Sequence, residues 1–208
     1  MNGEQKKELD HIIQSYRETN LDSIHYWLKY SALDSWQFWL TVVLLIVPLV
    51  ILYFKLDRRR VYQIGFYGFA IHVLGLYVDA IGTNYGFWSY PYKTIPALPT
   101  SFTLTSSMIP VGFMLMYQWQ SGKRINYYLC AAGVSAVFVF IIHPILMWLD
   151  LFNMYRGFNY GIMFVNYFTG SVLAKLVLDA FVKLNQQDDT RRIRYTPSYK
   201  ASGGRARH

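Results

Sequence analysis

The sequence predicts an all-α integral membrane protein, a bundle of five transmembrane helices with its N-terminus outside and its C-terminus in the cytoplasm. Apolar residues make up 53% of its 208 residues and charged residues only 15%, below the roughly 25% that is usual in soluble domains. The net charge is nevertheless +8, because the apolar and basic residues occupy different parts of the chain. This composition excludes a disordered chain and an ordinary soluble enzyme. The single cysteine, Cys130, excludes a small secreted fold held by disulfides.

Residues 1–35 are expected to form an external amphipathic helix ahead of a transmembrane domain at 36–182. Between residues 4 and 30, apolar side chains recur every three or four positions, which places them on one face of a helix. They are Leu9, Ile12, Ile13, Tyr16, Leu21, Ile24, Trp27 and Leu28. Two interpretations stay open. The helix lies on the outer membrane surface, or it docks on another membrane protein or on a second copy of the chain.

Five segments are long enough to cross about 30 Å of hydrocarbon as helices. They are residues 36–54, 61–81, 101–117, 127–149 and 161–181. The third segment is the shortest and begins with serines and threonines, so a re-entrant segment is the alternative there.

The orientation follows from the lysines and arginines. Thirteen of the 20 lie between the first and second spans, between the third and fourth, or after the fifth. Cytoplasmic loops carry an excess of Lys and Arg, so these three segments are expected on the cytoplasmic side and the N-terminus outside.

The remaining residues, 183–208, are expected to be a disordered basic tail in the cytoplasm. The tail carries seven bases against two acids, and each base near a cytoplasmic leaflet contributes about 1 kcal/mol to the attraction for anionic lipid. The expected partners are therefore the lipid bilayer and, through the tail, anionic lipids. Only Tyr195 and Tyr199 could stack on bases, so nucleic acid is not an expected partner.

Four glycines and two ionisable residues share one face of the second span. Gly65, Gly68, His72, Gly75, Asp79 and Gly82 follow one another at alternating spacings of three and four residues. Small residues allow membrane helices to approach closely. We therefore expect Gly65, Gly68, Gly75 and Gly82 to pack against other helices, and Gly170 and Ala174 to do the same from the fifth span.

His72 and Asp79 are candidate functional residues, because ionisable side chains are costly inside a membrane. His143 in the fourth span is expected in the same outer half of the membrane, and the three define a candidate polar pocket. Such a set could relay a proton or bind a metal, but metal motifs place two ligands one turn apart on one helix. We therefore predict no metal and no cofactor, and favour a hydrogen-bonded structural cluster. No catalytic set of residues is evident in the chain.

The loop at 82–99 contains three prolines and five aromatic residues. Aromatic residues concentrate at membrane–water interfaces, so one interpretation is a belt at the headgroups. The alternative is a lid over the candidate pocket, formed by Trp88, Tyr90 and Tyr92.

The same loop carries a resemblance to a known family. An Asp near a helix end is followed by Gly, by Gly-x-Trp-x-Tyr-Pro and by Pro-x-x-Pro. The residues are Asp79, Gly82, Gly86, Trp88, Tyr90, Pro91, Pro96 and Pro99. This pattern resembles a family of small multi-pass membrane proteins of endospore-forming Gram-positive bacteria, a family without an established function. The likeness covers most of residues 26–150.

The resemblance implies a multi-pass protein of the bacterial cell membrane and implies no reaction. The chain departs from the family pattern at His143 and near Thr105, where the family has acids, so a proton or cation role of those acids does not carry over. The chain is more loosely similar to small membrane carotenoid cyclases, but it lacks their glutamate-bearing motif.

Two functions remain. The favoured hypothesis is a non-enzymatic membrane protein, a subunit or interaction partner in envelope or spore-membrane assembly, whose partner is another membrane protein or a second copy of the chain. The alternative is a membrane-embedded site for small-molecule binding, transport or catalysis between the second and fourth spans, with His72, Asp79 and His143 at its centre.

Overall fold

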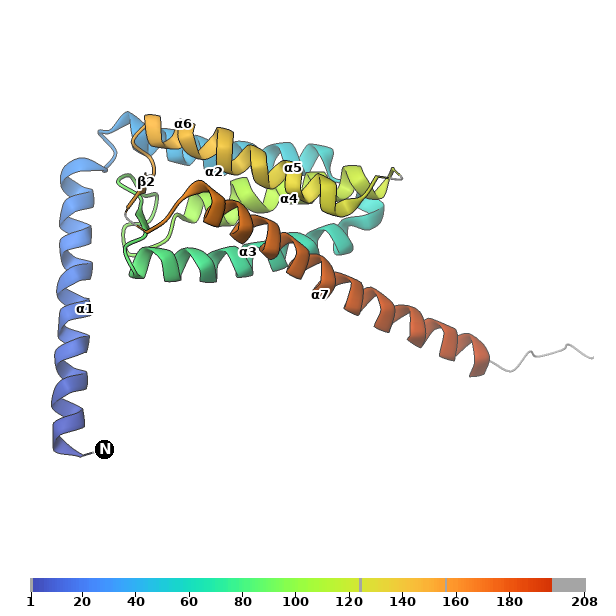
Figure 1. Cartoon of the computed structure of the whole chain (residues 1–208), viewed down its shortest axis with the longest axis horizontal. Coiled ribbons are helices and arrows are strands. Elements are labelled where there is room, and N and C mark those ends of the chain that lie inside the picture. Colours follow the sequence, from blue (N-terminus) through green and yellow to red (C-terminus); the bar gives the residue numbers. More distant parts are fainter. Residues whose placement is uncertain (1, 124, 156, 196–208) are drawn as a thin grey trace, which may run out of the picture.

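A computed structural model describes residues 2–123, 125–155 and 157–195, and within them the chain is almost entirely helical (Figure 1). The helices are α1 (Gly3–Tyr30), α2 (Trp36–Lys55), η1 (Arg58–Arg60), α3 (Val61–Asn84), η2 (Leu104–Met108), α4 (Ile109–Ser121), α5 (Tyr127–Val137), η3 (Phe138–Ile142), α6 (His143–Trp148) and α7 (Tyr160–Tyr195). Two short strands, β1 (Trp88–Ser89) and β2 (Asn153–Met154), pair antiparallel. They join the loop after α3 to the segment after α6.

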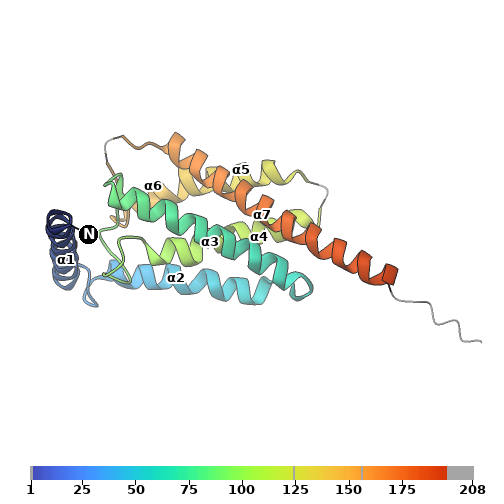
Figure 2. The ribbon, with the colours of Figure 1, turned by 90° about the horizontal axis from the view of Figure 1, so that it is seen from below.

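Among the described residues, four helices are long and apolar enough to cross a membrane: Trp36–Lys55, Arg58–Asn84, Tyr127–Trp148 and Tyr160–Gln186. The other predicted span, 101–117, forms η2 and α4 and is not one of these four. It lies inside the bundle, where η2 and α4 pack against α2 and α3 and α4 also packs against α5 (Figure 2). An interior helix needs little apolar outer surface, which accounts for the Ser and Thr residues at its start.

Two prolines set the shape of the interior helices. Pro110 and Pro144 each stand at the second position of a helix, and each follows a π-helical segment, η2 or η3. Proline has no N–H and its ring clashes with the carbonyl of the preceding turn, so that turn widens. Pro48, by contrast, lies within the continuous helix α2.

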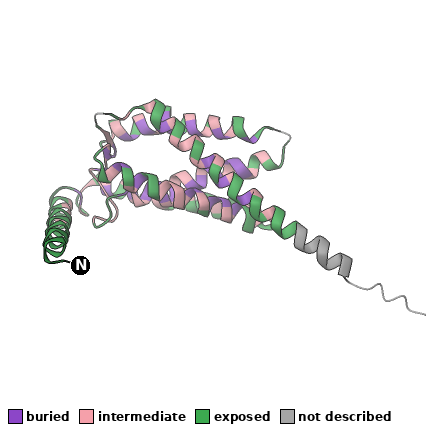
Figure 3. Ribbon diagram, turned by 60° about the horizontal axis from the view of Figure 1, so that its bottom comes forward, coloured by how far each residue is buried: buried purple, intermediate pink, exposed green. Residues whose placement is uncertain are grey.

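Helix α1 runs across the axis of the bundle, at the end that carries the loop after α3 (Figures 1 and 2). We call this the loop end. Two hydrogen bonds fix the angle: the Trp27 indole N–H donates to the Lys93 carbonyl over 2.7 Å, and the Ser31 hydroxyl donates to the Pro91 carbonyl over 2.7 Å. None of the residues of α1 is buried (Figure 3).

Helix α7 continues beyond the predicted fifth span. It ends at Tyr195, so the prediction of a disordered tail from residue 183 is corrected for residues 183–195. Seven of the 13 residues at 183–195 are Leu, Lys, Gln or Arg, which are good helix formers. Residues 196–208 of the predicted tail lie outside the described residues.

Candidate functional site

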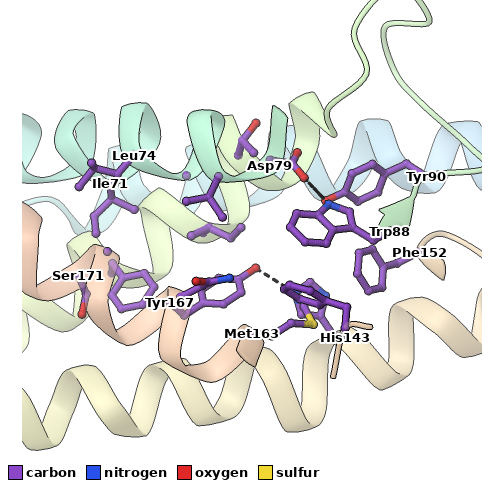
Figure 4. Close-up of a pocket in the computed structure, with 18 residues that line it drawn as sticks. Ile71, Leu74, Asp79, Trp88, Tyr90, His143, Phe152, Met163, Tyr167 and Ser171 are labelled. Carbon is purple, nitrogen blue, oxygen red and sulfur yellow. Dashed lines mark hydrogen bonds between the residues drawn. The ribbon is translucent and has the colours of Figure 1, made fainter. Parts of the chain in front are cut away.

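A cavity of about 90 Å³ lies between α3 and α7, toward the loop end (Figure 4). One water molecule needs roughly 10–15 Å³ by this measure, so the space is several times larger than one water. Its walls are mostly apolar and come from α3, α4 and α7, with Ile71, Leu74, Phe113 and Met163 among them.

The cavity opens sideways between α3 and α7. Gly75 on α3 and Gly170 on α7 both line it and are only partly buried, and a Cβ added at either would meet no atom within 4 Å. Val78, another lining residue, is 40% exposed. At the loop end, by contrast, the lining residues Trp88 and Tyr90 are buried. The opening therefore lies on the side of the bundle and not at its loop end.

Asp79 lines the cavity and has both carboxylate oxygens engaged. Its Oδ1 accepts from the Trp88 indole N–H and from the Tyr90 hydroxyl, each over 2.7 Å, and its Oδ2 accepts from the Ser101 backbone N–H over 3.0 Å. Burial and the neighbouring Asp79 raise the pKa of Tyr90 well above its ordinary value, so Tyr90 remains a donor. Charge-assisted hydrogen bonds of this kind are strong, and together they hold the loop against α3.

Two glycines make this arrangement possible. Gly82 lies one turn after Asp79, and a Cβ there would stand 1.8 Å from Cη2 of Trp88, so only glycine leaves room for the indole. Gly86 has a φ of +69°, a conformation that L side chains rarely adopt. Residues 79–90 of the motif therefore form one structural unit, which we call the Asp79 anchor.

Two of the three predicted lid residues line the cavity. Trp88 and Tyr90 lie over the cavity and line it at the loop end (Figure 4). Tyr92 does not line it; it packs, partly buried, in the apolar cluster beside it.

His143 lines the same cavity with half of its hydrogen-bonding capacity unused. The side chain is 2% exposed and stacks on Phe152 with ring centroids 4.7 Å apart. Its Nε2 is hydrogen-bonded to the Tyr167 hydroxyl over 2.9 Å, whereas its Nδ1 has no partner in the described part of the chain (Figure 4). Buried polar atoms without a partner are rare, and among the described residues Nδ1 shares this state with the hydroxyls of Ser106 and Ser135.

His72 lies apart from this pair. It does not line the cavity, and its Nδ1 is hydrogen-bonded to the Thr105 carbonyl over 2.8 Å. A carbonyl can only accept, so this nitrogen carries the proton. In a π-helix, the carbonyl of each residue accepts from the backbone N–H five residues later. For Thr105 that residue is Pro110, which has no N–H. His72 thus satisfies a carbonyl that Pro110 leaves open.

The predicted pocket is therefore only partly assembled. Asp79 and His143 line one cavity without a hydrogen bond to each other, and His72 has a separate structural role. Tyr167, which orients His143, was not singled out from the sequence. The available signal was a tyrosine within a span, because a buried tyrosine hydroxyl usually needs a partner.

Only some of the predicted packing residues lie at close helix contacts. A Cβ at Gly68 would stand 2.2 Å from the sulfur of Met114, and Ala174 is fully buried, so both lie at close helix contacts. Gly65, Gly75 and Gly170 face open space instead.

No group of three His, Cys, Asp or Glu side chains among the described residues could hold a metal ion. No protein-family model, no curated protein and no solved structure matches the chain. The resemblance to membrane proteins of endospore-forming bacteria, and the role in envelope or spore-membrane assembly, therefore stay predictions.

Proposed function

We propose that the protein is a multi-pass membrane protein that binds an apolar molecule from the bilayer in the cavity between α3 and α7. One observation carries the proposal: an apolar cavity opens sideways between two helices that are each long and apolar enough to cross a membrane. An opening in that position faces lipid, so an apolar molecule can enter without crossing water. This geometry favours the small-molecule hypothesis over an assembly subunit.

The proposal includes five spans, with η2 and α4 as the third, an external N-terminus and residence in the bacterial cell membrane. Its support is the distribution of Lys and Arg and the position of η2 and α4 alongside α2 and α3. The loop end is then the outer end.

The topology has a direct test. In a background in which Cys130 is replaced by Ala, Ala97→Cys places a thiol in the 82–99 loop and Lys123→Cys places one after α4. A membrane-impermeant thiol reagent should label Ala97→Cys in intact cells and Lys123→Cys only after permeabilisation. Labelling of both from one side would contradict a third span.

Helix α1 is proposed to lie along the outer membrane surface. Tyr16 and Trp27 are eleven residues apart, about three turns, so both point to the same side of the helix. Trp27 is hydrogen-bonded to the loop over the bundle, and the apolar residues Leu9 and Ile12 lie close to the same face. This face therefore turns toward the membrane, as in interfacial helices.

The binding proposal is tested by what leaves the bacterial membrane with the protein. Full-length protein is purified in mild detergent and extracted with organic solvent, and the extract is analysed by mass spectrometry. We expect one class of apolar molecule at a content near that of the protein. Gly75→Leu and Gly170→Leu fill the opening and should lower this content several-fold.

Gly65→Leu is the matched control. Gly65 also lies on α3 and faces open space, but it does not line the cavity. The Gly65→Leu protein should therefore carry as much of the extracted compound as the wild type. Equal content in all four proteins, or an extract that only mirrors the bulk lipid, would contradict the proposal.

A further inference from the structure

We propose that the cavity holds one hydrocarbon chain of a lipid, extended parallel to α3 and α7, while the polar group of that lipid stays outside. The inference rests on the proposed function and names the class of its ligand. It follows from the length of the cavity, its volume, its closed ends and the charge of its wall.

The cavity is elongated along the two helices that form its sides. On α3 its lining residues run from Ile71 to Asp79, and on α7 from Met163 to Ser171. In each helix they follow one another at spacings of three, one, three and one, which is one face of a helix over about two turns. A separation of eight residues at a rise of about 1.5 Å gives each side a length of about 12 Å. Helix α3 runs toward the loop end and α7 runs away from it, so Asp79 and Met163 lie toward one end of the cavity and Ile71 and Ser171 toward the other (Figure 4).

The volume of the cavity matches one chain of that length. Its volume of about 90 Å³ corresponds to about six to nine water molecules at roughly 10–15 Å³ each, and a methylene group is about as large as a water molecule. A fully extended chain with C–C bonds of about 1.5 Å needs about ten carbons to span about 12 Å. Volume and length therefore agree for a single file of carbons. Two chains side by side need twice the volume, and a compact ring fills only part of the length.

Both ends of the cavity are closed, so the chain enters from the side. Trp88 and Tyr90 are buried at the loop end, and Ile71 and Ser171 are buried at the opposite end. The opening lies between these ends, at Gly75. A chain in the surrounding bilayer is already away from water, so its transfer into the cavity brings no hydrophobic gain. The gain is the close van der Waals contact with walls on several sides.

The wall keeps the polar group of the lipid outside. Among the described residues no lysine or arginine lines the cavity, so an anionic headgroup inside it would be buried without a counter-charge. The Asp79 carboxylate already accepts from three donors, so it offers little to a cationic headgroup. The apolar chain is therefore the part of the lipid that fits.

The direction of the chain is tested by photolabelling of full-length wild-type protein in lipid nanodiscs. Two monoacylglycerol probes of equal chain length carry a diazirine, one near the terminal methyl and the other about six carbons closer to the glycerol, which separates the two positions by more than one helical turn of about 5.4 Å. Labelled residues are identified by mass spectrometry of the digested protein.

We expect one probe to label the end at Ile71 and Ser171 and the other to label the end at Asp79 and Met163. All four residues are buried, so labelling there reports occupancy of the cavity and not contact with the surrounding lipid. Labelling of the same end by both probes would overturn the inference.

A substitution that shortens the cavity gives a second test. Leu74→Trp places a large ring in the half away from the loop end, so we expect labelling at Ile71 and Ser171 to fall several-fold and labelling at Met163 to persist. Tyr62→Trp is the matched control, because Tyr62 lies on the same helix, is 91% exposed and does not line the cavity. An equal loss at both ends, in a Leu74→Trp protein that unfolds like the wild type, would mean that the occupant is one compact body and would overturn the inference.

The outcomes separate the two proposals. Suppose that Gly75→Leu lowers the content of the extracted compound. If the two probes then label one end or neither end, or if the compound has no hydrocarbon chain, the chain inference is overturned and the binding function stands. If neither probe labels the buried lining residues and the extract only mirrors the bulk lipid, both are overturned.

Discussion

Asp79 and His143 line one cavity, lie on helices long enough to cross a membrane, and are buried to a similar degree, with 5% and 2% of their surfaces exposed. They differ in their hydrogen bonds. Among the described residues, Asp79 accepts from three donors, whereas His143 has one hydrogen-bond partner and one nitrogen without a partner. Ionisable residues inside membranes are functional candidates by default. The comparison teaches that two ionisable residues of similar burial can differ in how completely the surrounding fold satisfies their polar atoms.

The difference arises from where the partners lie in the chain. All three donors to Asp79 come from the loop that follows its own helix, between Trp88 and Ser101, so a single loop conformation satisfies the carboxylate. The partner of His143 lies on another helix, at Tyr167. This tyrosine satisfies one nitrogen of the imidazole and leaves the other without a partner in the described part of the chain.

The largest expected effect is that of Asp79→Ala. The substitution leaves the Trp88 indole, the Tyr90 hydroxyl and the Ser101 amide without their acceptor. Each unsatisfied buried donor costs about 1–3 kcal/mol, so we expect the free energy of unfolding to fall by about 3 kcal/mol or more, and the loop to detach. Thermal unfolding in nanodiscs, followed by tryptophan fluorescence, measures this loss. Asp57→Ala, at a partly exposed carboxylate between α2 and α3, is the control. Equal losses in the two variants would refute the Asp79 anchor.

A smaller effect is expected at Gly82. Gly82→Ala drives a Cβ into the Trp88 ring, and overpacking of this kind typically costs about 1–3 kcal/mol. Gly75→Ala, two turns earlier on the same helix, meets no atom within 4 Å, and alanine has the higher helix propensity. Its free energy of unfolding should therefore be unchanged or slightly higher. The same unfolding assay compares the pair, and a larger loss at Gly75 would contradict the assignment of the two glycines.

His143 should tolerate substitution better than Asp79. His143→Phe keeps an aromatic ring beside Phe152, but it leaves one buried group, the Tyr167 hydroxyl, without its hydrogen-bond partner. One unsatisfied buried donor costs about 1–3 kcal/mol, whereas Asp79→Ala leaves three, so we expect the smaller fall in the free energy of unfolding for His143→Phe. The same unfolding assay compares the two variants, and a loss as large as that of Asp79→Ala would contradict this expectation.

Much of the fold could be predicted from local signals. The predicted helix at 4–30 corresponds to α1, Gly3–Tyr30, because its apolar residues recur with the helical period. Four of the five predicted spans correspond to the four long apolar helices, because long apolar runs end at charged residues. The segment 101–117 was the weakest, since a helix inside the bundle carries a less apolar pattern. The extension of α7 to Tyr195 was missed because composition suggested disorder.

The site was predictable only as a set of residues. Asp79 and His143 stand out in sequence because ionisable groups are costly in a membrane, but their partners depend on tertiary contacts that no spacing encodes. The role of His72 depends on the carbonyl that Pro110 leaves open. The glycines of α3 show the same limit. Gly68 and Gly75 share one face, yet Met114 fills the space beside the first and nothing fills the space beside the second.

The smallest expected effect concerns Asp57, a carboxylate that contrasts with Asp79 because it is only partly buried. Its oxygens accept from the Arg60 side chain over 2.8 Å and from the Arg59 backbone N–H over 3.0 Å, and these bonds, that of Arg60 first, lower the pKa of Asp57 below its ordinary value. A lowered folded-state pKa stabilises the fold above the unfolded-state pKa, and the contribution is lost as the pH falls through the folded-state value. Asp57→Asn should therefore lower the unfolding temperature slightly at pH 7, and the difference from the wild type should disappear as the carboxylate is protonated in acid. A difference that persists in acid would mean that the carboxylate charge is not its cause.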